Sequence, residues 1–275
     1  MSHHFTVFGS GGYVGSNLLL YLRRAGHEVQ GITRETWPVD GAKLGHVIFT
    51  IGMTADFRGK PLETFDTQVI RLHEVLSRYR FSSLLYVSST RIYYGADDAF
   101  ERSNILICPS DPDQTYNIAK LAGESLCLGI DRPTIRVVRL SNVFGGINQS
   151  PSFLRSILNE AALSGHVRFK TAPNSAKDYV HIDDVCRRLL EVSLFGSNRL
   201  YNLAAGSNIT HAEIASILGS AGVSSSFEQG AVARIFPVVT TSRADLEFGS
   251  LDRPFSMTFG EVLKSSLETT REANI

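Results

Sequence analysis

The chain has 275 residues, which suits one large domain or a domain with an added lobe and allows a sizeable hydrophobic core. Hydrophobic residues make up 43% and charged residues 20% of the sequence, a composition that excludes a largely disordered chain. The 27 basic and 27 acidic residues give a formal net charge of zero. Because the chain lacks an overall basic charge, we expect neither nucleic acid nor a membrane among its partners.

The cysteines and the N-terminal residues indicate the cellular compartment in which the protein is expected. Cys108, Cys127 and Cys186 have spacings that match neither a metal site nor a disulfide framework. We therefore expect no bound metal and a reducing compartment. Residues 1–8 lead directly into an apolar strand pattern without the layout of a signal peptide, and no apolar run reaches membrane-spanning length. These features predict a cytoplasmic protein.

Short β-rich runs alternate with helical patterns through the first half of the chain. Strands are predicted at residues 5–8, 28–32, 47–51, 84–87 and 135–140, and helices at residues 16–25, 62–80 and 114–128. Such alternation predicts crossover connections and a parallel sheet covered on both faces. The apolar run LLYV at residues 84–87 is typical of a strand buried on both faces. The pattern predicts an α/β fold with a Rossmann-like, doubly wound parallel sheet.

The regular alternation is expected to end after residue 142, and most of the remaining chain is predicted to form a smaller C-terminal lobe. Helices are expected at residues 153–163, 211–218 and 259–267. We predict that residues 1–142, with about 175–205, form the dinucleotide-binding domain. Residues 143–174 and 206–275 are predicted to form a substrate-binding lobe over the carboxyl ends of the strands, where ligands bind in such folds.

A glycine-rich turn joins the first predicted strand to the first predicted helix. Gly9, Gly12 and Gly15 recur every three residues in the run FGSGGYVG at residues 8–15. Such glycines allow a tight turn, close approach to a pyrophosphate and close helix packing, and the helix N-terminus offers free N–H groups to phosphate. An ordinary glycine turn is the alternative, but the strand-turn-helix context favours a dinucleotide. The predicted contacts are Gly9, Gly11, Gly12, Tyr13, Val14 and Gly15.

The end of the second predicted strand bears on which dinucleotide binds. A site that prefers NAD usually has an acidic residue there for the ribose 2′-hydroxyl. This chain has Thr33 and Arg34 after Ile32. Arg34 can pair with a 2′-phosphate through a charge-assisted bond, so we expect Thr33 and Arg34 to contact NADP. NAD, with Arg34 as a solvated loop charge, is the alternative.

A tyrosine and a lysine have the spacing of a catalytic pair. Tyr116 and Lys120 are four residues apart on a predicted helix and therefore share one face. A free phenol, with a pKa of about 10, is a poor acid or base near neutral pH, but a neighbouring ammonium lowers that pKa. We expect Lys120 to do so and to contact the cofactor. Tyr116, also beside the cofactor, would then exchange a proton with a sugar oxygen as hydride moves.

A tyrosine and a lysine at this spacing also occur by chance in many helices. The resemblance to a known family therefore depends on further segments of the sequence. Five ordered segments resemble the extended short-chain dehydrogenase/reductase family, which contains nucleotide-sugar epimerases, dehydratases and reductases. They are the glycine turn, YVSSTRIYYG at residues 86–95, RLSNVFG at 139–145, DYVHIDDV at 178–185 and YNLAAG at 201–206. The resemblance implies a Rossmann domain, a nicotinamide cofactor and a nucleotide-sugar substrate.

The resemblance also implies roles for single residues near the reacting sugar. Thr90 matches the catalytic serine or threonine of the family and would hydrogen-bond the reacting oxygen beside Tyr116. Ser88, at the same strand end, is expected near the cofactor, with its hydroxyl capping the strand. Arg91 is expected to contact the substrate.

Further positions match family residues that contact the substrate. Asn142 would contact the substrate phosphates, and Arg234 would bind the diphosphate, with a surface charge as its alternative. Lys177 replaces a family arginine and keeps the charge without the bidentate fork. His181 is expected to be structural.

Departures from the family pattern narrow the chemistry. Family dehydratases have Asp-Glu directly after the catalytic threonine, whereas this chain has Arg91 and Ile92, which disfavours loss of water. An NADPH-dependent 4-keto-sugar reductase is favoured over a 4-epimerase that retains NAD. A silent nucleotide-binding protein is the third alternative, and the presence of both Tyr116 and Lys120 disfavours it. In the family, helices corresponding to residues 62–80 and 114–128 form a dimer interface, so we expect a homodimer.

Overall fold

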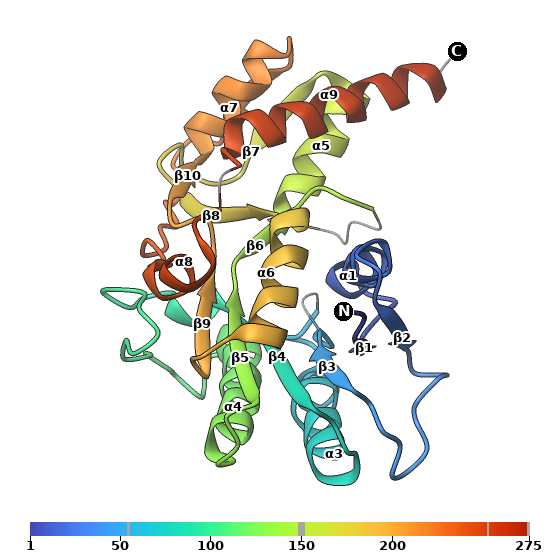
Figure 1. Ribbon diagram of the computed structural model, residues 1–275. Coiled ribbons are helices and arrows are strands. Elements are labelled where there is room, and N and C mark those ends of the chain that lie inside the picture. Colours follow the sequence, from blue (N-terminus) through green and yellow to red (C-terminus); the bar gives the residue numbers. More distant parts are fainter. Residues whose placement is uncertain (54–55, 148–151, 252, 274–275) are drawn as a thin grey trace.

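The computed structural model describes residues 1–53, 56–147, 152–251 and 253–273, and its centre is a six-stranded parallel sheet (Figure 1). The strands follow the order β2-β1-β3-β4-β5-β9. Their bounds are β1 His4–Phe8, β2 Glu28–Ile32, β3 His46–Phe49, β4 Ser83–Ser89, β5 Ile135–Leu140 and β9 Leu200–Leu203. The predicted fold class is confirmed, and β2 and β5 have the predicted bounds.

Helices cover both faces of this sheet. On one face lie α1 (Tyr13–Arg24) and α6 (Ile182–Phe195), and on the other lie α2 (Pro61–Phe65), α3 (Arg71–Arg78) and α4 (Thr115–Gly129). Strand β4 contributes side chains to the hydrophobic cores on both faces of the sheet. Leu85 and Val87 belong to the core under α1 and α6, whereas Leu84 and Tyr86 belong to the core under α3 and α4. Because successive side chains point to opposite faces, a continuous apolar run fills both cores.

The predicted helix at residues 62–80 is divided. It consists of α2, one π-helical turn at Asp66–Ile70, and α3. Leu62 and Ile70 are exposed on this segment, and the homodimer stays a prediction. Within the described residues, every helix falls short of the length and apolar character needed to cross a membrane.

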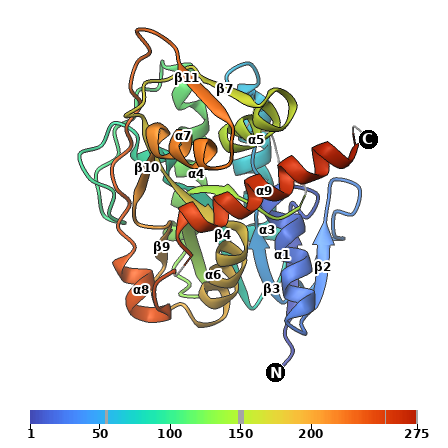
Figure 2. The same ribbon diagram turned by 90° about the horizontal axis from the view of Figure 1, so that it is seen from above.

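The C-terminal lobe contains two small sheets, ordered β10-β8-β6 and β11-β7. Their strands are β6 Asn142–Phe144, β7 His166–Phe169, β8 Ala176–His181, β10 Asn208–Thr210 and β11 Ser224–Phe227. The lobe helices are α5 (Phe153–Ser164), α7 (His211–Ser220) and α9 (Phe255–Ala273), while α8 (Ser242–Phe248) contacts β9 of the main sheet. Figure 2 shows α9 crossing the lobe beside α5 and α7. Phe144, Phe255 and Phe259 are buried in the lobe core.

The expectation that strand-helix alternation ends at residue 142 is wrong. After β8, helix α6 packs on the main sheet and β9 joins it beside β5. The local sequence favours this helix, because His181 caps its N-terminus and Asp183 and Asp184 lie in its positively polarised first turn. Strand β8 itself pairs with β6 and β10 of the lobe. The predicted domain boundaries stay a prediction.

A buried ion pair joins α4 to the sheet. Arg139 of β5 donates to Glu124 of α4, with Nη2 2.7 Å from Oε2 and Nε 3.1 Å from Oε1, and these side chains are 7% and 4% exposed. Ser88 of β4 also donates to Glu124 Oε1, at 2.5 Å. Arg139 Nη1 lies 2.7 Å from the Tyr93 hydroxyl, which is 2.8 Å from Asn202 Oδ1 in β9. The network therefore fixes α4 relative to three strands.

Replacement of Arg139 should strongly destabilise the fold. Arg139→Met leaves the Glu124 carboxylate buried without its cation, and we expect a loss of about 3–5 kcal/mol in the free energy of unfolding, measured by urea denaturation. Arg78→Met is the control, because Arg78 is 58% exposed in its surface ion pairs and should cost no more than about 1 kcal/mol. Equal losses in the two variants would contradict the assigned importance of the buried pair.

Candidate active site

Two connected cavities open at the carboxyl ends of the central strands. The first, of about 840 Å³, reaches the end of β2 and is called the β2 cavity. The second, of about 480 Å³, reaches the end of β4 and is called the β4 cavity. Both linings include Gly12, Thr50 and Gly52. Because β2 and β3 lie on opposite sides of β1, the cavities meet at the point where the strand order reverses, the usual ligand site of such sheets.

The glycine turn forms one wall of both cavities. Gly9 has a φ of +84°, and a Cβ on Gly15 would lie 2.2 Å from Gly9 O, so both positions require glycine. Gly12 is the N-cap of α1 and provides no side-chain cap. Residues 12–15 line the β4 cavity, and Gly9, Gly11 and Gly12 line the β2 cavity. The exposed helix N-terminus therefore meets the requirements for holding a pyrophosphate.

The end of β2 brings two predicted residues to the β2 cavity and adds an acid that the sequence analysis missed. Thr33 and Arg34 line the cavity, and so do Glu35 and Arg71. The Thr33 hydroxyl donates to Glu35 Oε2 at 2.6 Å. This carboxylate directly follows Arg34 in the sequence, and its position after β2 is the signal that marks it. The cavity thus offers both a cation and an acid near the position where an adenosine ribose would bind.

Helix α4 brings Tyr116 and Lys120 to the β4 cavity on adjacent turns. Both side chains line it, with exposed fractions of 7% and 3%. Lys120 Nζ donates to Val87 O at 2.9 Å and lies 5.8 Å from the centroid of the Tyr116 ring. The expected juxtaposition is therefore present, although the ammonium is directed to a strand carbonyl.

The electrostatics correct one expectation about this pair. Burial raises the pKa of the Tyr116 hydroxyl, whereas a hydrogen bond with Ser89 and the charge of Arg91 lower that pKa. Lys120 is not among the groups that shift this pKa, and its desolvated amine donates to Val87 O. Burial lowers the pKa of Lys120 to about 7, against the opposing effect of Glu124. Arg91 and Ser89 therefore replace Lys120 as the groups that stabilise a Tyr116 phenolate.

Ser88 and Ser89, at the end of β4 before Thr90, have different roles. The Ser88 hydroxyl donates to Glu124, so it belongs to the buried network even though the residue also borders the β4 cavity. Ser89 points to the other side, accepts a hydrogen bond from Arg91 N at 3.2 Å and contacts Tyr116. Thr90 lines the cavity as expected. The sequence analysis missed Ser89, which strand alternation identifies once Ser88 is known to face α4.

Several predicted substrate contacts surround the same cavity. Asn142 and Lys177 line it, and Asn142 Nδ2 donates to Asp178 O at 2.8 Å. Lys177 Nζ lies 5.7 Å from the Phe153 ring and 5.6 Å from the Phe236 ring. Burial lowers the pKa of Lys177, and the nearby charges of Arg91 and Arg234 add to this effect.

Two further residues lie outside the lining. Arg234 is exposed and is not among the residues that line the β4 cavity, although its charge acts on Lys177 and Arg91. His181 accepts a hydrogen bond from Asp183 N at the start of α6 and contacts the Phe144 ring edge-on, which agrees with the structural role expected for it.

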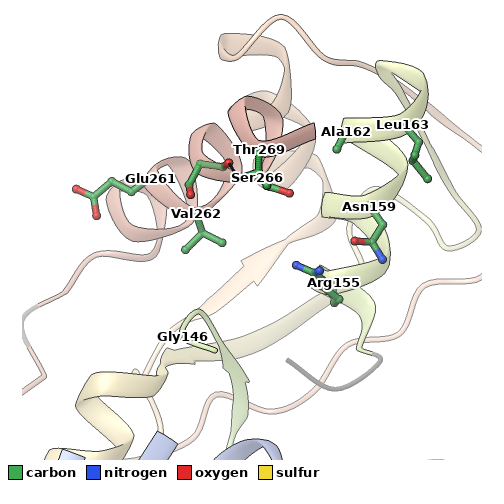
Figure 3. Close-up of a pocket in the computed structure, with 10 residues that line it drawn as sticks. Gly146, Arg155, Asn159, Ala162, Leu163, Glu261, Val262, Ser266 and Thr269 are labelled. Carbon is green, nitrogen blue, oxygen red and sulfur yellow. Dashed lines mark hydrogen bonds between the residues drawn. The ribbon is translucent and has the colours of Figure 1, made fainter. Parts of the chain in front are cut away.

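A hollow of about 600 Å³ lies away from these cavities, between α5 and α9 (Figure 3). Arg155 and Asn159 of α5 lie across it from Glu261, Val262 and Ser266 of α9. None of the residues predicted for the cofactor or substrate lines this hollow within the described chain. The candidate site therefore lies at the strand ends rather than in the lobe.

Comparison with known families agrees with the site's architecture. The model of the "NAD dependent epimerase/dehydratase family" matches residues 59–204, just over half of the chain. The chain belongs to this family. The matched region includes Tyr116, Lys120 and Asn142, while the glycine turn precedes it. A search of curated protein sequences found no match.

Solved structures share the fold at low sequence identity. RMD from Pseudomonas aeruginosa, complexed with NADPH, has a TM-score of 0.77 at 18% identity, covering 98% of this chain and 100% of that chain. MoeE5, in complex with UDP-glucose and NAD, has a TM-score of 0.76 at 20% identity, covering 99% and 100%. UDP-glucose 4-epimerase from Thermotoga maritima, with UDP-glucose, has a TM-score of 0.72 at 18% identity, covering 99% and 100%. The resemblance inferred from the five segments is confirmed at the level of family and fold.

The lowered pKa of Lys120 predicts a pH-dependent stability. Between pH 7 and its ordinary pKa of 10.5, this amine binds a proton in the unfolded chain but not in the folded chain. Its effect on the free energy of unfolding therefore becomes more favourable as pH rises, by about 1.4 kcal/mol per pH unit in that window. Urea denaturation at pH 7 and pH 9 should show that Lys120→Met loses this rise, whereas the exposed control Lys43→Met keeps it. An unchanged pH dependence in Lys120→Met would contradict the depressed pKa.

Proposed function

We propose that the chain is an NADP-dependent oxidoreductase that reduces the 4-keto group of a nucleotide-activated sugar. The observation that supports this most is the shared lining of the β4 cavity, where Tyr116, Lys120 and Thr90 face the N-terminus of α1. A proton donor, an amine and a hydroxyl beside a dinucleotide cradle are the groups that carbonyl reduction needs.

The β2 cavity and the glycine turn suit the adenosine and pyrophosphate of the cofactor. The uncapped N-terminus of α1 would hold the pyrophosphate, and Thr33 and Arg34 would contact the 2′-phosphate of the ribose. Lys120 would contact the nicotinamide ribose, and the Ser88 main chain would border it. When bound, NADPH would supply the hydride to the sugar carbon.

The protein side of the reaction is a proton transfer. Tyr116 would donate its hydroxyl proton to the carbonyl oxygen as that oxygen gains negative charge, and Thr90 would hydrogen-bond the same oxygen. The resulting phenolate would be stabilised by Ser89 and Arg91, the groups that lower the Tyr116 pKa. The Tyr116 proton would be restored from solvent, and the product would carry a hydroxyl where the substrate had a ketone.

The polar groups around the β4 cavity suit a nucleoside diphosphate. Lys177 and Asn142 line the cavity near the lobe, and the charge of Arg234 acts on Lys177. These groups would hold the diphosphate, so that the sugar reaches Tyr116. Solved relatives of the same fold, MoeE5 and the Thermotoga enzyme, are complexes with UDP-glucose, which supports a nucleotide sugar.

A 4-epimerase that retains NAD is the second candidate. One observation favours it: Glu35 lies at the end of β2 and lines the β2 cavity, where a carboxylate can bind a free ribose 2′-hydroxyl. Arg34 in the same lining favours NADP and therefore the reductase. The presence of both Tyr116 and Lys120 in one cavity argues against a silent binding protein.

Loss of the Tyr116 hydroxyl should abolish turnover and spare cofactor binding. With a nucleotide-linked 4-keto sugar, wild-type protein should consume NADPH, followed by its near-ultraviolet absorbance. Tyr116→Phe should lower kcat about 10²- to 10⁴-fold because the proton donor is gone. Tyr21→Phe is the control, because this half-exposed phenol on α1 does not line the β4 cavity. NADPH affinity, measured by fluorescence, should stay unchanged in both variants.

The same assay separates the candidates. Conversion of a 4-hydroxy nucleotide sugar to its epimer without net NADPH consumption would favour the epimerase over the reductase. Full activity in Tyr116→Phe would overturn the assignment of the proton donor in either enzyme.

The cofactor preference should depend on Arg34. Arg34→Gln removes the proposed partner of the 2′-phosphate, so KM for NADPH should rise about 10- to 100-fold while KM for NADH changes little. Glu35→Gln is the neighbouring control and should leave KM for NADPH low. An equal effect of Arg34→Gln on both cofactors would show that the residue does not read the 2′-phosphate.

A further inference from the structure

Arg91 carries a charge into the part of the β4 cavity where the sugar is expected. It directly follows Thr90 in the short 3₁₀ turn Thr90–Tyr93 at the end of β4. Its half-buried side chain lines the cavity with Thr90 and Tyr116, and its charge is close enough to lower the pKa of the Tyr116 hydroxyl. Arg91 is therefore near the proton donor and next in sequence to the residue expected to bind the reacting oxygen.

The guanidinium of Arg91 is incompletely paired within the described residues. Its Nη2 donates to Asp113 O over a long 3.4 Å, and its carbon Cζ lies 5.2 Å from the Phe57 ring centroid. Its Nε is buried and has no hydrogen-bond partner in the described part of the chain. Asp113, the acid whose charge acts on Arg91, forms its ion pair with Arg58. A buried donor left without a partner is unfavourable, so a side-chain rearrangement that pairs Nε with a ligand acceptor would be favoured.

The charge of the cavity indicates what kind of acceptor fits. The charged side chains among its described lining residues are Arg91, Lys120 and Lys177, and none of those lining residues is an acid. Lys120 is bonded to Val87 O, which leaves Arg91 and Lys177 as the cations directed to a ligand. Desolvated cations without a carboxylate partner select anionic groups.

The two cations serve different parts of the substrate. Lys177 packs between Phe153 and Phe236 on the lobe side, where the diphosphate is proposed to bind. The charge of Arg91 also acts on Lys177, but Arg91 directly follows Thr90 and acts on Tyr116, so the part of the substrate nearest to it is the sugar. A planar guanidinium matches a carboxylate through two parallel hydrogen bonds.

We propose that Arg91 binds a carboxylate on the sugar ring, next to the reacting carbon, so that the substrate is a nucleotide-linked sugar acid. The inference rests on the proposed function and specifies its substrate class. It assigns Arg91 as the residue that distinguishes an acidic sugar from its neutral counterpart. The Nη1 atom is the donor open to the carboxylate, and rotation of the side chain would bring the buried Nε to the same group.

The test compares nucleotide sugars that differ only in the sugar carboxylate. Calorimetry with the full chain and saturating NADP would use UDP-glucuronic acid against UDP-glucose, and GDP-mannuronic acid against GDP-mannose, with UDP and GDP as references. In at least one pair, wild-type protein should bind the acid about 10- to 100-fold more tightly than the neutral sugar, the range expected for hydrogen bonds to a charged group.

Variants of Arg91 distinguish recognition of the sugar carboxylate from a purely structural role of this side chain. Arg91→Gln should remove the preference for the acid while leaving the affinity for the neutral sugar within about threefold, and Arg91→Lys should retain part of the preference. Arg58→Gln is the matched control, because Arg58 is half-exposed, pairs with Asp113 and does not line the cavity. It should keep the wild-type preference. Thermal unfolding would verify that each variant folds, and Arg91→Lys carries the test if Arg91→Gln does not.

Three results would overturn the inference. Equal wild-type affinity for the acid and neutral sugars would remove the carboxylate site but leave the proposed function intact. Equal weakening of both sugars by Arg91→Gln would mean that Arg91 only supports the turn around Asp113. Failure of every nucleotide sugar and of both nucleotides to bind would refute the proposed function itself, and the inference with it.

Discussion

The buried ion pair between Arg139 and Glu124 is the contact on which the site's geometry depends. It links β5 to α4 at the centre of the protein, and Ser88 joins the same carboxylate from β4. A buried pair of this kind contributes more to a defined arrangement than to net stability, because desolvation offsets much of its attraction. Here the arrangement matters, since α4 carries Tyr116 and Lys120 to the end of β4.

Because side chains alternate along β4, two neighbouring serines at its end have different roles. Ser88 faces α4 and completes the buried network, while Ser89 faces the cavity and contacts Tyr116. On the opposite wall, Gly15 allows α1 to approach the turn at Gly9 so closely that a side chain would collide with its carbonyl. The helix N-terminus and the Tyr116 hydroxyl thereby line one continuous cavity at the switch in strand order.

The electrostatics of the β4 cavity differ from a simple tyrosine-lysine pair. Burial raises the pKa of Tyr116 and lowers that of Lys120, so desolvation opposes the charged form of each group. Arg91 is the cation that acts in favour of the phenolate. Arg91 therefore connects the acidity of Tyr116, the proposed proton donor, with the proposed selection of an anionic sugar, and both depend on the absence of acids from the described lining.

The sequence by itself determined the sheet of parallel strands, the glycine turn and the shared face of Tyr116 and Lys120, because each follows from periodicity or spacing within a short segment. It placed residues of about 175–205 with the dinucleotide-binding domain but did not predict the helix α6 and the strand β9 within them. It also did not identify Ser89 and Glu35 as lining residues. Only the tertiary structure decided that Lys120 binds Val87 O and that Arg91 acts on Tyr116. These features depend on burial and on contacts between distant segments, and desolvation is a property of the packed chain that local patterns do not contain.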